Sequence, residues 1–571
     1  MRNSCAALFL ALVLAGCQHP ARNAADTGAA TAPWDAFVAA FLDEHAAIQP
    51  GWAVNTGRHE FDGKLADFSR AGIERLIAHA RAARERALSF GDASLGVAQR
   101  FERDNLVAEL DDELFWLEEG ARPWTSPAFY AFALDPNVYI DREYAPLAQR
   151  MRAYSAWARA VPAVLREARA NLRTPMPRSY LQLGRNVIGG LARFLEGDVP
   201  AVFAPVRDAA LRGEFDAANA AAAKSLKEFD AWLATQESAA TDAYALGAEK
   251  FLRMLRATEG VDVPLARLKE MGERDLERNL ASLRAACSRF AAGQTVEACV
   301  AKVRARKPAE GPVAAANKQL HELRAFIVER RVVTIPGPEV ADVKEAPPYR
   351  RWNAAYIDVP GPYEKNLLST FRIAPPDPKW SAAEQAAYVP GISDLLFYSV
   401  HEVWPGHFLQ HLHSDRSPSP VGRLFRSYAF SEGWAHYAEE MMWEMGLGDG
   451  DPEVHVAQII NALWRDVRYL SAIGLHTGGM TVAESEAMFR QKAFLDAGNA
   501  RQQAARGTFD PGYGNYTLGK LMIRKLRNDW TATRGGRAAW QAFHDELLGH
   551  GSPPLPLLRK AMLPGDSGPA I

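Results

Sequence analysis

Long runs of helix-forming residues, with apolar side chains at three- and four-residue spacing, dominate the sequence from Trp34 onward. The clearest runs are rich in Ala, Leu, Arg and Glu and cover residues 65–88, 95–119, 145–172 and 208–233. These runs are long but lack heptad regularity, so they indicate packed helices of a large α domain and not a coiled coil. The sequence therefore predicts a mainly α fold.

The helical pattern is interrupted between residues 332 and 378, where prolines and glycines are frequent. Two short runs within this stretch, residues 354–359 and 368–373, have the character of β-strands. They predict a small β-sheet or an ordinary connecting hairpin. Helical residues resume after Ser381, and Ser381 and Glu384 are predicted to form a capping box at the start of the next helix.

Composition places the chain among ordinary globular proteins and excludes some partners. The 571 residues are 48% hydrophobic and 23% charged, with 66 Lys and Arg against 68 Asp and Glu. A net charge of −2 gives no indication of a nucleic-acid or polyanionic partner. Nothing in the sequence indicates an obligate protein partner.

The first 17 residues are predicted to be a lipoprotein signal peptide. A short basic start, Met1–Asn3, precedes an apolar run at residues 6–14 that is too short to span a bilayer. Residues 14–17 match a bacterial lipobox, in which Cys17 is lipidated and becomes the mature N-terminus. A plain secretory signal and a buried helix start are the alternatives.

A lipid on Cys17 predicts a protein anchored on the periplasmic side of the cell envelope. Gln18 after the cysteine favours the outer membrane, and residues 18–33 are predicted to be a flexible tether. In this oxidising compartment Cys287 and Cys299 are predicted to form a disulfide, with two buried free thiols as the alternative.

The stretch His401-Glu-Val-Trp-Pro-Gly-His407 has the composition of a zinc hydrolase site. In such sites two imidazoles bind the metal, and a Glu beside the first one handles the proton of a water. The usual spacing is H-E-x-x-H, because residues four apart share a helix face. Here the second His comes six residues later and would point about 120° away on an unbroken helix. A local bulge at Pro405 and Gly406 is predicted to bring His407 back to the face of His401.

A second stretch supplies a candidate third ligand. Glu432 precedes Gly433 and Trp434 about thirty residues downstream, near the start of another helical run. Two His and one Glu are a standard ligand set of open catalytic zinc sites. The alternative is a solvated acid that is favoured in the first helical turn by the helix dipole.

These two stretches, H-E-x-x-P-G-H-x-x-Q and E-G-W-x-x-Y-x-E, resemble the bacterial family of domain of unknown function 885, whose members are often lipoproteins. That family is in turn similar to the gluzincin metallopeptidases of the thimet-oligopeptidase and thermostable-carboxypeptidase types. The resemblance covers residues 34–565. It implies a large helical zincin-like fold with a deep cleft, and a small β-sheet beside the metal-binding helix. The edge strand of that sheet would hold an extended peptide by backbone hydrogen bonds.

The resemblance also implies roles for residues outside the two stretches. Tyr516 matches the Tyr of a Y-x-x-G motif, and related peptidases use such a Tyr to stabilise the oxyanion. Packing of a helix start is the alternative role for Tyr516. His476 lies in another family motif and is a candidate for binding substrate or the oxyanion, or else a core residue. Independently of the resemblance, Arg524 and Arg527 are candidates for receiving a substrate carboxylate, or else solvated arginines.

The remaining histidines of the motif region leave one alternative open. His407 and His411 are four residues apart and would form a ligand pair without any bulge, although this pair would leave out His401. We expect His413 and His436 to lie behind the ligands or at the surface. Glu439 and Gln410 are candidates for orienting the ligating imidazoles.

Together these features predict a lipid-anchored, zinc-dependent peptidase in the periplasm. Zn²⁺ is bound by His401, His407 and Glu432, and Glu402 is the general base. A helical lobe at residues 34–330, a metal-site lobe at 331–565 and a tail at 566–571 form the chain. The alternatives are a metal-dependent amidase acting on a non-peptide or cell-wall amide, and a catalytically inactive peptide-binding lipoprotein of the envelope.

Overall fold

The computed structural model describes residues 31–347, 350–351, 353–566 and 568–571. The predicted signal peptide, Cys17 and most of the predicted tether lie outside these ranges. The first helix begins at Thr31, so the last three residues of the predicted tether belong to a helix. In the described ranges, no helix has both the length and the apolar character needed to cross a membrane.

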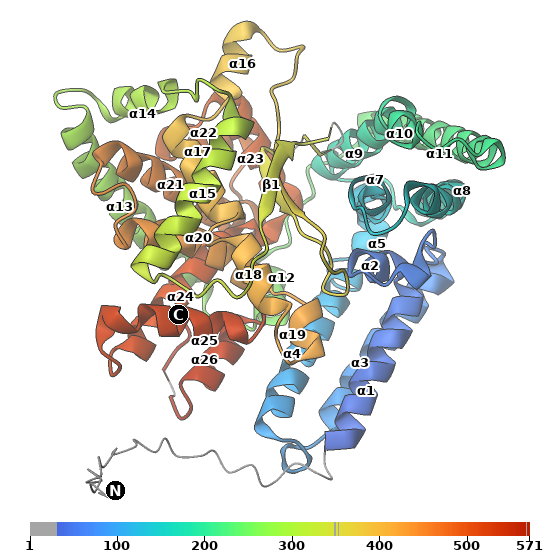
Figure 1. Ribbon diagram of the computed structural model, residues 1–571, viewed down its shortest axis with the longest axis horizontal. Helices are drawn as coiled ribbons and strands as arrows, with labels where there is room; N and C mark the ends of the chain where they lie inside the picture. Colours follow the sequence, from blue (N-terminus) through green and yellow to red (C-terminus); the bar gives the residue numbers. More distant parts are fainter. Residues whose placement is uncertain (1–30, 348–349, 352, 567) are drawn as a thin grey trace, which may run out of the picture.

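The predicted mainly α fold is confirmed, and α-helices make up most of the described chain (Figure 1). The helices before the sheet are α1 Thr31–Ile48, α2 Pro50–Asn55, α3 Arg70–Ser89, α4 Val97–Leu117, α5 Arg122–Thr125, α6 Pro127–Ala133, α7 Asn137–Asp141, α8 Leu147–Asn171, α9 Arg178–Gly197, α10 Val199–Phe203, α11 Ala209–Thr235, α12 Ala248–Glu259, α13 Leu265–Phe290, α14 Val296–Ala305 and α15 Pro312–Arg330. The helices after the sheet are α16 Ala382–Tyr388, α17 Ile392–Glu402, α18 His407–Ser414, α19 Pro420–Leu424, α20 Tyr428–Glu444, α21 Pro452–Thr477, α22 Val482–Lys492, α23 Ala497–Phe509, α24 Asn515–Thr531, α25 Trp540–Gly549 and α26 Leu555–Met562. Short 3₁₀ turns are η1 His59–Phe61, η2 Asp92–Ser94, η3 Glu237–Ala239, η5 Pro511–Gly514 and η6 Gly536–Ala539.

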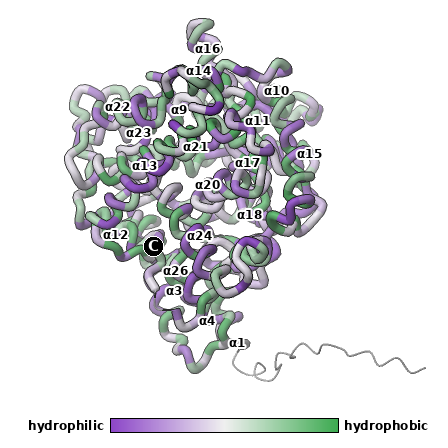
Figure 2. Tube along the Cα trace, turned by 90° about the vertical axis from the view of Figure 1, so that its left-hand side faces the viewer, coloured by the Kyte–Doolittle hydropathy of each residue, from purple (hydrophilic) through white to green (hydrophobic). Residues whose placement is uncertain are grey.

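The four clearest predicted runs correspond to helices α3, α4, α8 and α11. Polar caps account for where several helices begin. Ser69 accepts a hydrogen bond from the backbone of Gly72 at the start of α3, and Asp208 does the same for Leu211 at the start of α11. The predicted capping box of Ser381 and Glu384 is also present at the start of α16. Apolar and polar residues alternate along most helices (Figure 2), as expected for helices that each bury one face.

Two large hydrophobic cores organise the molecule. One contains buried residues between Val54 and Leu233, and α8, α9 and α11 pack together within it. The larger core contains residues from Phe251 to Met562 together with Phe115. Figure 1 shows the first group of helices on one side of the sheet and α13–α26 mainly on the other. Residues on both sides of position 330 belong to the larger core, and the lobe boundary there stays a prediction.

A three-stranded sheet lies between these two helical groups (Figure 1). Its strands are β1 Ala341–Glu345, β2 Ala355–Asp358 and β3 Ser369–Ile373, in the order β1-β3-β2. Strand β3 is buried along its whole length and pairs in parallel with β1 and antiparallel with β2. The two predicted strands are thus confirmed. Strand β1 was not predicted, because three of its five residues are charged.

The loop between β2 and β3 is attached to the N-terminal helices by ion pairs. Arg142 contacts the carboxylate of Glu364 at 2.9 Å and the carbonyl of Val359 at 3.2 Å. His59 contacts the same Glu364 at 3.1 Å and stacks on Tyr144, with 3.6 Å between the ring centroids. These contacts hold the β2–β3 pair against the first group of helices.

Two further predictions concern the C-terminal half. The predicted disulfide between Cys287 and Cys299 is present and connects α13 to α14. Residues 566–571 were predicted to be a tail beyond the metal-site lobe, and Ala570 and Ile571 within it pack against the larger core. Arg559 also donates a hydrogen bond to the carbonyl of Gly568. The end of the chain is therefore attached to the body by both apolar and polar contacts.

Candidate metal centre

The His401–His407 stretch forms a break between two helices. Helix α17 ends at Glu402 and α18 begins at His407, so the predicted bulge within one helix is replaced by a complete interruption. The N–H of Gly406 reaches back to the carbonyl of Val400 at 2.9 Å. A Cβ atom on Gly406 would lie only 1.7 Å from the carbonyl oxygen of His401, so this close return of the chain requires glycine.

The break brings the two motif histidines together as the sequence predicted. Their ring centroids are 4.9 Å apart, and the ring planes are nearly perpendicular. Trp434 fixes the break by donating its indole N–H to the carbonyl of Pro405 at 2.8 Å. Trp434 of the second motif therefore holds the backbone of the first motif in place by this hydrogen bond.

Glu432 comes from the second turn of α20, which Ser427 caps. This helix packs closely against α24, because a Cβ on Gly433 would lie 2.5 Å from the Cα of Gly519. A Cβ on Gly519 would in turn lie 1.8 Å from the carbonyl oxygen of Ala429. The two glycines thus bring α20 and α24 into close contact, and Glu432 and Tyr516, at the start of α24, line the same cavity.

Among the described residues, His401, His407 and Glu432 form a group whose ligand atoms all lie within 4.8 Å of one another. Oε2 of Glu432 lies 3.3 Å from Nε2 of His401 and 3.2 Å from Nε2 of His407. Ligand atoms about 2.0–2.1 Å from a tetrahedral zinc ion are separated by roughly 3.3 Å, which matches both distances.

The chemistry of these atoms also fits a metal. Oε2 of Glu432 is buried and makes no hydrogen bond within the described structure. Burial alone raises the pKa of Glu432, but the two neighbouring imidazoles outweigh it and hold the pKa well below its usual value. A carboxylate oxygen and two imidazole nitrogens that converge without hydrogen bonds are a donor set for Zn²⁺.

A buried acid orients the first histidine. Nδ1 of His401 lies 2.7 Å from Oε1 of Glu439, and Arg465 contacts the same oxygen at 3.2 Å. If Nδ1–H donates to Glu439, the Nε2 lone pair of His401 faces Glu432 and His407. Glu439 thus occupies the position that the sequence predicted for it. His436 is fully buried beside Glu439, with 3.8 Å between Nδ1 and Oε2.

Gln410 does not orient an imidazole as predicted. Its amide donates to the hydroxyls of Ser431 at 3.1 Å and Ser552 at 2.9 Å. These bonds attach α18 to α20 and to the segment before α26.

Glu402 and Tyr516 lie beside the three candidate ligands. Both line the same cavity, and both are buried. Burial raises the pKa of the Glu402 carboxyl and the pKa of the Tyr516 hydroxyl. The Tyr516 ring is nearly parallel to the His401 ring, with 6.1 Å between centroids.

His476 is not brought to the site. It is buried near α12, where Nε2 lies 2.7 Å from the carbonyl of Gly507 and Nδ1 accepts the N–H of Leu246 at 3.3 Å. Burial lowers the pKa of His476 to about 4, which agrees with a neutral ring. Both ring nitrogens are bonded to backbone, so His476 is a core histidine.

The predicted carboxylate-binding arginines are also elsewhere. Arg524 pairs with Glu440 at 3.0 Å, and Arg527 pairs with Glu444 at 2.7 Å. His411 lines the cavity but is not in the ligand group. His413 points away, and its Nε2 lies 2.8 Å from the carbonyl of Thr334.

The cavity at this site has a volume of about 320 Å³. One wall is the edge strand β2 with the two residues before it, and the others come from α17, α18, α20, α21, α23 and α24. Three arginines that the sequence did not single out, Arg465, Arg468 and Arg506, also line it. Arg465 and Arg468 are charged residues within the mostly apolar sequence of α21, and this feature could have indicated them in the sequence.

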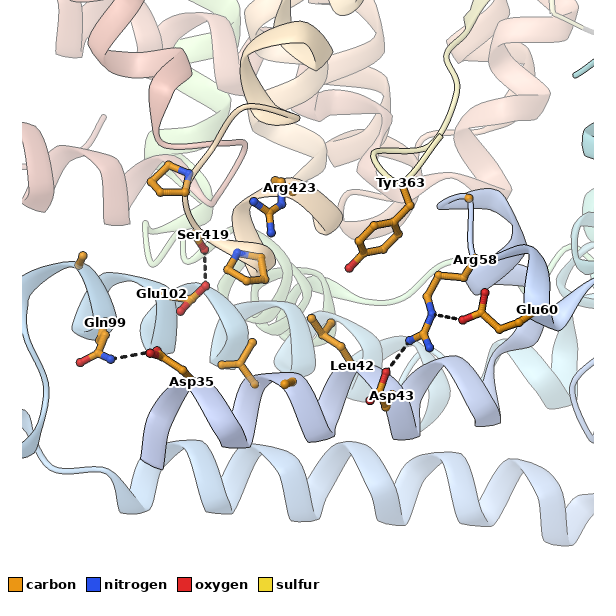
Figure 3. Close-up of a pocket in the computed structure, with 16 residues that line it drawn as sticks. Asp35, Leu42, Asp43, Arg58, Glu60, Gln99, Glu102, Tyr363, Ser419 and Arg423 are labelled. Carbon is orange, nitrogen blue, oxygen red and sulfur yellow. Dashed lines mark hydrogen bonds and ion pairs between the residues drawn. The ribbon is translucent and has the colours of Figure 1, made fainter. Parts of the chain in front are cut away.

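A larger cavity of about 850 Å³ lies between α1, α4 and the segment around α19 (Figure 3). Its charged side chains are largely satisfied by one another. Arg58 pairs with Asp43 and Glu60, each at 2.8 Å, and Ser419 donates to Glu102 at 2.6 Å. No group of metal ligands was found there among the described residues, so the smaller cavity is the candidate site.

Residues 50–562 match the family described as "Bacterial protein of unknown function (DUF885)". The chain belongs to the DUF885 family. The match covers both helical groups, the sheet and every candidate site residue. A search of the curated proteins finds no match.

Two solved structures show the same fold as this DUF885 chain. One is a predicted lipoprotein of unknown function from Shewanella oneidensis, with a TM-score of 0.75 and 23% identity, covering 93% of this chain and 99% of the other. The second is a predicted lipoprotein from Colwellia psychrerythraea, with a TM-score of 0.80 and 15% identity, covering 93% of this chain and 98% of the other. At these identities the similarity shows the fold alone.

Proposed function

We propose that this protein is a zinc-dependent peptidase that hydrolyses peptide bonds in the cavity around Glu432. The observation that carries the proposal is the convergence of one carboxylate oxygen and two imidazole nitrogens without hydrogen bonds. Glu402 is the immediate neighbour of His401 and lines the same cavity. The similarity to gluzincin peptidases inferred from the motifs agrees with this proposal.

His401, His407 and Glu432 would hold the ion, and Glu439 keeps the ring of His401 in position. A bound Zn²⁺ lowers the pKa of a coordinated water to about 7. Glu402 accepts a proton from the attacking water at its carboxylate and passes it to the leaving amine. The hydroxyl of Tyr516 donates a hydrogen bond to the oxygen of the substrate carbonyl as negative charge develops there.

The edge strand β2 favours a peptide over other amides. It pairs with β3 on one side only, and its residues Ala355–Ile357 line the cavity. An extended peptide can pair with such a strand through backbone hydrogen bonds, whatever its side chains are. A non-peptide amide would not use this wall.

Metal content and hydrolysis test the proposal together. Purified protein should contain one zinc per chain and cleave short peptides, and a chelator should abolish both. His401→Ala, His407→Ala and Glu432→Ala should each lose zinc, because three ligands leave no redundancy in an open site. His413→Ala, on the same helix as His407 but bonded to Thr334, is the matched control and should keep both zinc and activity.

Three results would contradict the proposal. Wild-type protein without zinc or hydrolysis would favour an inactive binding protein. Zinc with cleavage of other amides but not of peptides would favour an amidase. Loss of zinc in His411→Ala together with retention in His401→Ala would show that His407 and His411 are the histidine ligands.

We also propose that the protein is anchored by lipid on Cys17, facing the periplasm at the outer membrane. The lipobox and the two structurally similar proteins described as predicted lipoproteins support this. Cys17→Ser should release the protein from the membrane fraction or block its maturation. Unchanged fractionation without lipid labelling of the wild type would contradict the anchor.

A further inference from the structure

Arg468 is a buried cation in the wall of the candidate site. Its side chain comes from α21, and only 6% of the residue is exposed. Among the described residues no carboxylate lies within 4.0 Å of its guanidinium, whereas Arg465 pairs with Glu439 at 3.2 Å and Arg506 with Asp510 at 2.9 Å. Arg468 is therefore the arginine of this cavity that lacks a counter-charge.

The surroundings of Arg468 hold it in place without neutralising it. Its Nε donates to the amide oxygen of Gln503 at 2.9 Å. Its guanidinium carbon lies 4.9 Å from the ring centroid of Trp464 and 4.7 Å from that of Tyr516. Its two terminal nitrogens have no hydrogen-bond partner in the described structure. They also retain some exposed surface, since they are not fully buried. Arg468 itself lines the cavity.

Leaving such a group unpaired is costly. A buried charge is normally paired or hydrogen-bonded, because removal from water penalises the charged form. Burial and the neighbouring Arg506 both lower the pKa of Arg468. An anionic ligand in the cavity would remove this penalty, and the planar guanidinium would bind a carboxylate through two parallel hydrogen bonds.

We propose that Arg468 binds a carboxylate of the substrate, so that the site takes peptides with a free carboxylate close to the cleaved bond. This inference rests on the proposed function for the bond that is cleaved. The Tyr516 ring centroid lies 4.7 Å from the guanidinium carbon of Arg468 and 6.1 Å from the His401 ring centroid, so the guanidinium carbon is within about 11 Å of the His401 ring. An extended chain spans about 3.3–3.6 Å per residue, so the carboxylate lies at most about three residues from the cleaved bond.

Two sources could supply this carboxylate: the C-terminus of a short peptide or an acidic side chain. Three probes distinguish them, namely tri-alanine, tri-alanine amide and Ala-Ala-Asp amide. Binding to wild-type protein stripped of metal by a chelator is measured by calorimetry, and hydrolysis is measured on the zinc-loaded protein. Neither measurement on wild type depends on a variant that folds poorly.

Tri-alanine should bind the metal-free protein on the order of 10- to 100-fold more tightly than its amide, as expected for charge-assisted hydrogen bonds. If Ala-Ala-Asp amide matches tri-alanine, the source is a side chain; if it matches tri-alanine amide, the source is the C-terminus. Equal binding of all three probes, or binding of none, overturns the inference. If the protein prefers carboxylate probes but neither contains zinc as purified nor hydrolyses peptides, the role of Arg468 stands and only the proposed function is overturned.

Substitution of Arg468 gives an independent test. Arg468→Gln should remove the preference for tri-alanine over its amide, and should raise KM more than it lowers kcat. Arg468→Lys keeps the charge but cannot form the two parallel hydrogen bonds of a planar guanidinium, and should retain part of the preference. Melting temperatures identify a variant that is merely misfolded. A folded Arg468→Gln protein with the wild-type preference overturns the assignment to Arg468.

Discussion

At the scale of single residues, the described part of the candidate site contains a carboxylate oxygen without a hydrogen bond and a guanidinium group without a carboxylate partner, and both side chains line one cavity. Most buried charges in this protein are paired, as Lys520 is with Asp275 at 2.6 Å. Among the described residues, Oε2 of Glu432 is buried without a hydrogen bond, and the guanidinium of Arg468 has no carboxylate within 4.0 Å. Such exceptions concentrate where a protein binds something else, because each one costs stability in the free protein.

Glu402→Gln should separate catalysis from metal binding. The amide has nearly the size and polarity of the carboxyl group but cannot accept a proton from water. General-base catalysis contributes about 10²–10⁴-fold, so peptide hydrolysis should fall by at least about 100-fold. Zinc content and melting temperature should stay near wild type. A Glu402→Gln protein with full zinc and near-normal turnover would contradict the proposed role of Glu402.

The sequence indicated much of the site because motif chemistry is local. His401, His407, Glu432, Glu402 and Tyr516 all line one cavity, as their motifs predicted. The roles of His476 and of the arginines were not predictable in this way. A buried His bonded to two backbone groups and a His at a reaction centre look the same in sequence. Only the fold shows that Arg468 faces the cavity while Arg524 and Arg527 face acids of α20.

At the scale of elements, the site depends on the interruption between α17 and α18 and on the contact between α20 and α24. The sequence predicted that Pro405 and Gly406 would change the direction of a helix. It could not distinguish a bulge from a complete break, because the outcome depends on Trp434, which binds the Pro405 carbonyl from a distant part of the chain. Strand β1 was missed for a related reason: its pairing with β3 outweighs a polar composition.

Gly406→Ala should damage the site through the backbone. The new Cβ would collide with the His401 carbonyl, so the loop must move and carry His401 and His407 with it. We expect a loss of about 1–3 kcal/mol of stability and a clear loss of zinc. Gly213→Ala is the matched control, because a Cβ there meets nothing within 4 Å in the exposed interior of α11. It should raise stability by about 0.5–1 kcal/mol and leave zinc unchanged. Equal melting temperatures and zinc contents in both variants would contradict the role of Gly406.

His59 should make the attachment of the β2–β3 loop depend on pH. Burial lowers the pKa of His59, but the hydrogen bonds to Asp62 and Glu364 outweigh it and raise the pKa to about 9. A folded pKa above the unfolded value of about 6.5 stabilises the protein fully below pH 6.5, and this contribution disappears as the pH rises through 9. After allowance for its partial exposure, the contribution is about 1–2 kcal/mol. His59→Gln should therefore lower the urea midpoint at pH 6 and leave it nearly unchanged at pH 10, and equal losses at both pH values would contradict this account.

At the scale of the whole molecule, the helical content was predictable and the arrangement of the helices was not. Amphipathic periodicity identifies helices one at a time, and α3, α4, α8 and α11 were identified in this way. The division into two cores, with a sheet between two helical groups, depends on contacts between residues far apart in the chain. The Cys287–Cys299 pair was predictable because the two cysteines are close in sequence.

Removal of this disulfide should lower stability without affecting the site. Both cysteines are buried at the junction of α13 and α14, away from the residues that line the candidate site. Closing a loop of this length contributes about 3 kcal/mol on the chain-entropy estimate. A Cys287→Ala, Cys299→Ala double variant should melt at a lower temperature, with zinc content unchanged. A reducing agent should lower the melting temperature of the wild type but not that of the double variant; an equal response would contradict this assignment.

The position of strand β2 has a consequence for solubility. An unpaired edge strand is a common starting point for aggregation, because any other extended chain can add to it. Here the edge strand lines a cavity of about 320 Å³, which is far too small to admit the sheet of a second molecule. The surrounding helices therefore sterically block other protein molecules from this edge of the sheet. A single short chain can reach the strand, and a neighbouring protein molecule cannot.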